Sequence, residues 1–194
     1  MTKLTRNDLY SLESYAEMRD DFRSRVMAHK KNRRVDLGEH VALFFEDQLI
    51  MHYQIQEMLR AEKIFNGKDI QEELDTYNPL IPDGTNWKAT MMIQYSDVAE
   101  RIRMLAKLKG IDTKTWVRVN GHDKVFAISD EDLERESEEK TSAVHFLRFE
   151  LSPEMIADLK NGTKLAAGID HENYRCELDP IAENITTSLI TDLK

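Results

Sequence analysis

Gln54, Glu57 and Arg60 are polar residues spaced three apart within residues 41–65, a segment otherwise rich in apolar side chains. On a helix, side chains three apart lie on the same side. A carboxylate held there beside a buried segment could have a shifted pKa and act as a general acid or base. The alternative is a structural ion pair between Glu57 and Arg60. We favour the ion pair because no nucleophile or oxyanion hole accompanies the carboxylate.

Histidine is a common metal ligand, and the chain has six of them. They form no HExxH motif, no ExxH motif and no close pair, so their spacing predicts no metal site. His40 and His52 are the candidates nearest to the polar stripe, but the hairpin predicted between them would point them to opposite faces. His171 lies at a predicted turn. A site built from distant residues, such as Glu46, Glu57 and a later histidine, is an alternative.

Residues 22–35 hold six cations and no acid. Such side chains could clamp a phosphate or carboxylate, or dock an acidic protein. Together with Arg60 they are the predicted anion-binding or partner-binding residues: Arg23, Arg25, Lys30, Lys31, Arg33 and Arg34. Residues 129–140 have the opposite character, with seven acids against two cations. The two segments could also simply face solvent or each other, which is the more common role of charge runs.

The rest of the composition excludes several classes of protein. The net charge of −9 argues against a general nucleic-acid-binding protein, and no aromatic residues interleave the cations as base stacking would require. No glycine-rich phosphate loop occurs. Cys176 is the single cysteine, which excludes an internal disulfide and a cysteine-held cluster. No apolar run approaches the ~20 residues of a membrane span, and no secretory signal opens the chain, so we expect a cytoplasmic protein without a membrane partner.

The elements that must position these residues predict an α+β fold in one domain over residues 1–194, with a subdivision near residues 82–86 as the alternative. A long N-terminal helix is predicted from about residue 6 to 31. Shorter helices are predicted over about 54–65, 69–77, 97–109, 153–161 and 181–193. Hairpins are predicted for residues 41–46 with 49–53, 115–119 with 124–128, and 164–169 with 174–178, and single strands for 87–95 and 141–151. Because hairpins join most strands, the sheet should be mostly antiparallel, with the helices packed on it.

Specific sequence patterns run through almost the whole chain. The most specific are QIQEMLRAE and the pair YNPLIP and KATMMIQ, accompanied by KLTRNDLYSLESY near the start and GIDHENY near the end. With these segments the chain resembles the domain of unknown function 3501 family. The resemblance implies a bacterial cytoplasmic protein and carries no established activity. Proteins of this kind tend to be encoded near rubrerythrin-like and iron–sulfur electron-transfer proteins, which implies a redox or oxidative-stress setting.

Two functional hypotheses follow. The first is an accessory protein that binds an acidic partner, such as a redox protein, or an anionic ligand through the basic segment and the helix that carries Arg60. The second is a metal-dependent or acid–base enzyme with a pocket around Glu57. The sequence favours the first and identifies no cofactor or substrate. A homodimer through the first helix is a further alternative.

Overall fold

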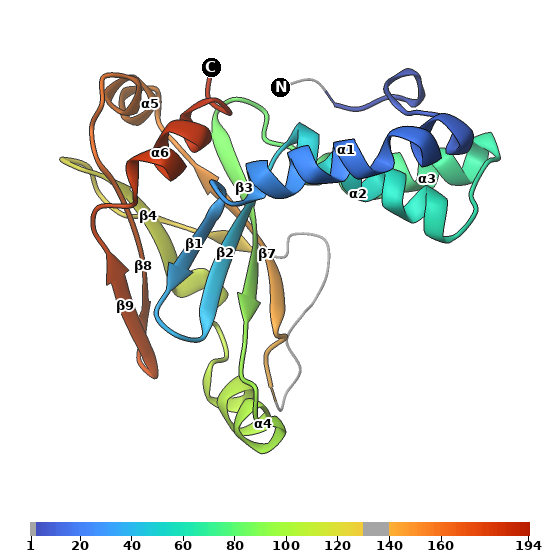
Figure 1. Ribbon diagram of the computed structural model, residues 1–194. Helices are drawn as coiled ribbons and strands as arrows, with labels where there is room; N and C mark the ends of the chain where they lie inside the picture. Colours follow the sequence, from blue (N-terminus) through green and yellow to red (C-terminus); the bar gives the residue numbers. More distant parts are fainter. Residues whose placement is uncertain (1–2, 130–139) are drawn as a thin grey trace.

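The computed structural model describes residues 3–129 and 140–194, and its strands form two antiparallel sheets (Figure 1). The larger sheet has the order β1-β2-β3-β7-β6, with bounds Arg34–Leu37, Val41–Glu46, Asn86–Ile93, Val144–Glu150 and Ile128–Ser129. The smaller sheet has the order β5-β4-β8-β9, with bounds Val125–Phe126, Thr115–Val119, Leu165–His171 and Tyr174–Leu178. The predicted α+β class and the antiparallel pairing are therefore confirmed.

Six α-helices accompany the sheets in the described part of the chain: α1 (Leu12–Lys30), α2 (Gln48–Ala61), α3 (Gly67–Tyr77), α4 (Val98–Lys107), α5 (Pro153–Lys160) and α6 (Glu183–Ile190). The long N-terminal helix is confirmed as α1, with 19 residues. α1 packs on α2 and α2 packs on α3, so the three form a helical layer at one side of the sheets (Figure 1). None of the described helices is both long and apolar enough to span a bilayer.

The main hydrophobic core joins the two sheets. It contains Trp87 and Phe149 from the larger sheet and Val117 and Ala167 from the smaller one, each with no exposed surface. The helical layer has two smaller clusters of its own, one around Ile55 and one between α1 and α2 that includes Phe22 and Tyr53. The strands therefore share one core, while α1, α2 and α3 are held partly by contacts among themselves.

The hairpin predicted between residues 41–46 and 49–53 is wrong in its second half, because residues 48–61 form α2 and β2 pairs with β1 instead. Asp47 is the N-cap of α2, and its Oδ1 accepts a hydrogen bond from the Ile50 N–H at 2.9 Å. The buried residues Ile55 and Leu59 are four apart, which fits the period of a helix and not that of a strand. The apolar run at residues 49–53 is too short for its sequence to distinguish the helical period from that of a strand.

Gly38 turns the chain between β1 and β2. Its φ of +74° lies in the left-handed region that favours glycine. A Cβ atom at this position would lie 2.6 Å from the hydroxyl oxygen of Tyr174. That hydroxyl donates to the Leu37 carbonyl at 2.7 Å, so β9 and the turn are held together.

Two other helix starts differ from the prediction. The first helix does not begin at Arg6, because Arg6–Asp8 forms only a short 3-10 turn and Ser11 then caps α1. The helix predicted from about residue 69 begins earlier, at Gly67, because Asn66 is the N-cap of α3. The Asn66 Oδ1 accepts from the Asp69 N–H at 3.0 Å, so Asp69 lies in the first turn.

The remaining predicted elements are confirmed with small differences at their ends. They are β3, α4, the β4–β5 hairpin, β7, α5, the β8–β9 hairpin and α6. Most of the acidic segment 129–140 lies outside the described residues.

Arg33 is only 1 % exposed, so the prediction that it belongs to a binding surface is wrong. Its Nε donates to the Phe45 carbonyl at 3.1 Å, and its Nη2 donates to the Glu46 carbonyl at 3.1 Å. Nη2 also forms an ion pair with the buried carboxylate of Asp192. The guanidinium therefore satisfies the end of β2 and neutralises a carboxylate from the far end of the chain.

Asp192 follows α6, and its side chain has no exposed surface. Burial raises the pKa of Asp192 to about 6, although Arg33 acts in the opposite direction. Two further contacts hold the same helix. Arg33 Nη1 donates to the Ser188 carbonyl at 3.3 Å, and Trp87 Nε1 donates to the Leu189 carbonyl at 2.9 Å. Buried polar contacts therefore dock the end of α6 on β2 and β3.

We expect the substitution Asp192→Ala to lower the free energy of unfolding by about 3 kcal/mol, because it removes the closer of the two carboxylates that neutralise the buried Arg33 guanidinium. The other carboxylate, Asp47, remains, with its Oδ2 at 3.4 Å from Arg33 Nε. Urea unfolding followed by tryptophan fluorescence measures this loss. The matched control is Asp36→Ala, which breaks the exposed ion pair with Arg34 (2.7 Å) and should cost less than about 1 kcal/mol. Equal losses in the two variants would contradict the role given to Arg33.

Candidate functional site

Glu57 lies at the contact between α1 and α2. Its carboxylate accepts a bidentate pair of hydrogen bonds from Arg19, Nε to Oε1 at 2.8 Å and Nη2 to Oε2 at 2.7 Å. The hydroxyl of Tyr15 donates to the same Oε1 at 2.7 Å. Tyr15 and Arg19 are four apart on α1, so one face of that helix supplies both donors. The sequence analysis missed both donors, because residue spacing within one helix does not reveal which helix packs against it.

The hydrogen bonds from Arg19 lower the pKa of Glu57 to about 2, an effect that desolvation only partly opposes. A carboxylate with so low a pKa is a weak base at neutral pH and does not supply protons. Burial, and then the hydrogen bond to Glu57, raises the pKa of Tyr15. The predicted pairing of Glu57 with Arg60 is replaced by the bond to Arg19, and Arg60 is exposed and contributes only a weaker electrostatic attraction. The group therefore acts as a clamp between α1 and α2.

Buried amides fix the N-terminal segment on the helical layer. Gln56, fully buried on α2, accepts a hydrogen bond from the Tyr10 N–H at 2.8 Å and donates to the Tyr10 carbonyl at 3.4 Å. Asn78 binds the backbone of Leu4 in the same way. Its side chain accepts a hydrogen bond from the Leu4 N–H at 2.8 Å and donates one to the Leu4 carbonyl at 2.9 Å. Gln54, the predicted candidate, is half-buried on the same helix. The two side-chain amides thus satisfy backbone N–H and C=O groups that would otherwise need hydrogen bonds from a neighbouring strand.

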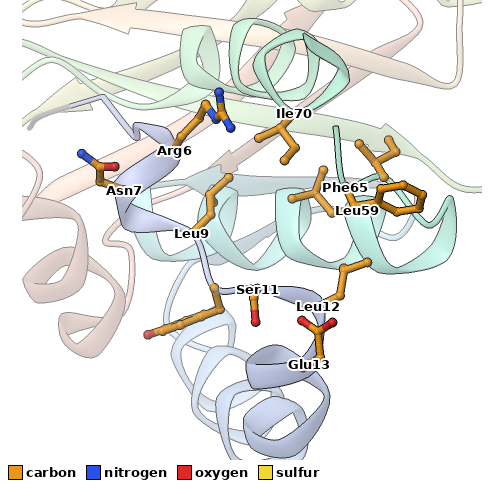
Figure 2. A pocket seen from close by; sticks show the side chains of 11 residues that line it. Arg6, Asn7, Leu9, Ser11, Leu12, Glu13, Leu59, Phe65 and Ile70 are labelled. Carbon is orange, nitrogen blue, oxygen red and sulfur yellow. The ribbon is translucent and has the colours of Figure 1, made fainter. Parts of the chain in front are cut away.

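A groove of about 570 Å³ lies where this N-terminal segment crosses the helical layer (Figure 2). Its apolar lining comes from three parts of the chain that are distant in sequence: Leu9 and Leu12, then Leu59 and Ile64, then Ile70. Charged and polar side chains line it as well, among them Arg6, Asn7, Ser11 and Glu13. The sequence gives no direct signal for this groove, because the two amide clamps that shape it join residues 46 and 74 apart.

The predicted metal candidates are not brought together. His40 stacks on Tyr95 with ring centroids 4.0 Å apart, and His52 stacks on Tyr10 within the helical layer. Their separation does not depend on the predicted hairpin register, which is wrong. Burial lowers the pKa of His52, which favours the neutral ring.

The two other metal candidates have protein partners. Both ring nitrogens of His171 bond to backbone atoms, Nε2 to the Lys109 carbonyl at 2.9 Å and Nδ1 to the Asn173 N–H at 3.2 Å. Glu46 accepts from the Thr90 hydroxyl at 2.7 Å. Within residues 3–129 and 140–194, no group of three His, Cys, Asp or Glu side chains could hold a metal ion.

The predicted basic segment is divided by the fold. Arg33 is buried, Arg34 is paired with Asp36 at 2.7 Å, and Arg25 lies over the Phe22 ring at 5.4 Å from its centroid. The remaining members are Arg23 and Lys31, which are exposed, and Lys30, which is half-buried. No acidic side chain of the described residues forms an ion pair with any of these three. A smaller basic surface than the sequence predicts, made by Arg23, Lys30 and Lys31, therefore remains on the C-terminal half of α1.

We expect Glu57→Gln to lower the free energy of unfolding at neutral pH by about 1 kcal/mol, allowing for solvent screening at this half-buried site. Because the folded pKa of Glu57 is depressed, its contribution is present above the unfolded pKa near 4.5 and is lost as the pH falls toward 2. The difference between wild type and variant should therefore shrink over this range in urea unfolding. Glu17→Gln, an exposed change on α1, is the control and should show no such pH dependence.

The comparisons with known proteins agree with the geometry in assigning no activity. The family model described as protein of unknown function (DUF3501) matches residues 3–193. A novel protein of unknown function from Burkholderia pseudomallei K96243, known from a crystal structure, is 49 % identical, with full coverage of both chains and a TM-score of 0.94. No curated protein matches the sequence. The extent of the family match shows that this chain belongs to the DUF3501 family of proteins of unknown function.

Proposed function

We propose that this protein is a cytoplasmic accessory protein that binds an acidic protein partner through the C-terminal end of α1. The binding residues are the exposed or half-exposed cations Arg23, Lys30 and Lys31. The observation that carries the proposal is that these three have no ion-pair partner among the described residues. They lie in a chain whose net charge is −9.

The positions of these cations suit a partner with a charged surface better than a small ligand. Arg23 and Lys30 are seven apart on α1, so they lie on one side of the helix two turns from each other. They are spread along the helix, and none of them lines the groove described above. Cations spread in this way steer an acidic partner and fix its orientation, and they contribute to the association rate more than to affinity.

An acidic redox protein is the partner class that the family resemblance implies. Small acidic electron carriers commonly use weak, salt-sensitive contacts, and a surface of a few separated cations fits such an encounter. The alternative, an acid–base enzyme around Glu57, gains no support from a carboxylate with a pKa of about 2 held by Arg19 and Tyr15. The group is satisfied by the protein itself and points at no cavity described above.

The proposal is tested with a fluorescein-labelled poly-L-glutamate peptide as the acidic probe. We expect the wild-type protein to bind it at low ionic strength and to lose affinity as salt is added, because exposed charges are screened beyond about 8 Å at physiological ionic strength. The double variant Arg23→Glu with Lys31→Glu should bind about tenfold more weakly in fluorescence anisotropy, which equals about 1.4 kcal/mol. Both side chains are exposed, so the fold should be unchanged.

The control variant carries the same change in charge elsewhere. Lys114→Glu with Lys160→Glu alters two exposed lysines outside the helical layer. If the two double variants bind the peptide equally, only the net charge matters and the proposed surface is not the binding site. Circular dichroism of each variant separates loss of binding from loss of fold.

A further inference from the structure

Phe65 is 80 % exposed, the most exposed large hydrophobic side chain in the described part of the chain. It lies between α2 and α3, on the rim of the groove in the helical layer (Figure 2). Leaving a phenylalanine in water forgoes the stabilisation that its burial would give. An exposed aromatic ring beside an apolar groove is typical of an interaction surface.

The backbone on both sides of Phe65 is fixed, so its exposure is built into the fold. Lys63 has a φ of +54°, and the Ile64 N–H donates to the Leu59 carbonyl at 2.9 Å, which closes the end of α2. Ile64 then enters the groove lining. On the other side Asn66 caps α3. The ring is therefore presented outward from a short loop between two anchored residues.

The same surface carries opposite charges. Arg6 and Glu13 both line the groove at separate places, and both are exposed (Figure 2). Neither forms an ion pair with a described residue. The Arg6 guanidinium packs closely over Gly67, where a Cβ atom would come within 2.6 Å of Nη1. The glycine leaves room for a cation at the start of α3, so the position of Arg6 is also set by the fold.

This surface combines a protruding ring, a groove, a cation and a carboxylate, so two copies of it can be complementary to each other. In a two-fold dimer the same patch of each subunit meets its copy, so residue i contacts j while j contacts i. A two-fold dimer that inserts each Phe65 ring into the groove of the other copy would also offer each Arg6 the Glu13 carboxylate of the other copy as a partner. The presence beside the same groove of both a cation and a carboxylate that are unpaired within the described residues is the charge complementarity that favours a second copy as the occupant.

We infer that the helical layer is a self-association surface, at which two copies of this chain exchange Phe65 side chains between their grooves. This dimer uses the N-terminal end of α1 and does not depend on the acidic-partner function proposed above.

Sedimentation velocity over a wide range of protein concentration tests the dimer directly. The wild-type protein should pass from monomer to dimer as concentration rises. Phe65→Ser should raise the dissociation constant at least about tenfold, since the change removes the buried ring. Phe126→Ser is the matched control, because Phe126 is also an exposed phenylalanine (44 %) but lies on β5 outside the groove. It should leave the dimer unchanged.

Charge exchange tests the geometry of the pairing. Arg6→Glu and Glu13→Arg should each weaken the dimer, because like charges would then meet across the two-fold axis, and the double variant should restore it. A wild-type protein that stays monomeric up to about 1 mM, well above the range of specific dimers, would overturn the inference. So would a dimer that is unaffected by Phe65→Ser, or a double variant as weak as the single ones.

Discussion

The guanidinium of Arg33 is a positive charge buried between segments that are up to 159 residues apart in sequence. A buried charge without a partner is among the most costly features that a protein can contain, so Arg33 depends on the two buried carboxylates beside it, Asp192 and Asp47. Asp192 brings the end of α6 against the end of β2, and Asp47 is the residue that begins α2. The end of β2, the start of the helical layer and the C-terminal helix therefore meet at one buried guanidinium.

The polar residues of α2 form hydrogen bonds within the protein. Glu57 is held by Arg19 and Tyr15, and Gln56 supports the backbone at Tyr10. These contacts are needed because the helical layer has only small hydrophobic clusters. Groups that satisfy each other in this way stabilise the layer and have little capacity left for chemistry.

The features that remain available for binding lie at the two ends of α1. The 19 residues of this helix span about 28 Å at 1.5 Å per residue. The exposed cations occupy the C-terminal half of the helix, from Arg23 to Lys31, whereas the groove begins at Leu12, about 16 Å from Arg23 along the axis. This distance exceeds the Debye length of about 8 Å at physiological ionic strength, so binding of an acidic partner at one end and self-association at the other are compatible.

The sequence by itself determined the local elements: the long helix, the antiparallel hairpins with clear turn residues, and the family. It failed for residues 49–53, predicted as a strand, because a short apolar run fits both a strand and a helix and only the tertiary packing decides between them. It also could not distinguish Arg33 from Arg34, adjacent cations of which one is buried and the other exposed. Burial, ion pairing and the groove beside Phe65 were decided by the tertiary structure alone, because each depends on contacts between segments that local spacing does not encode.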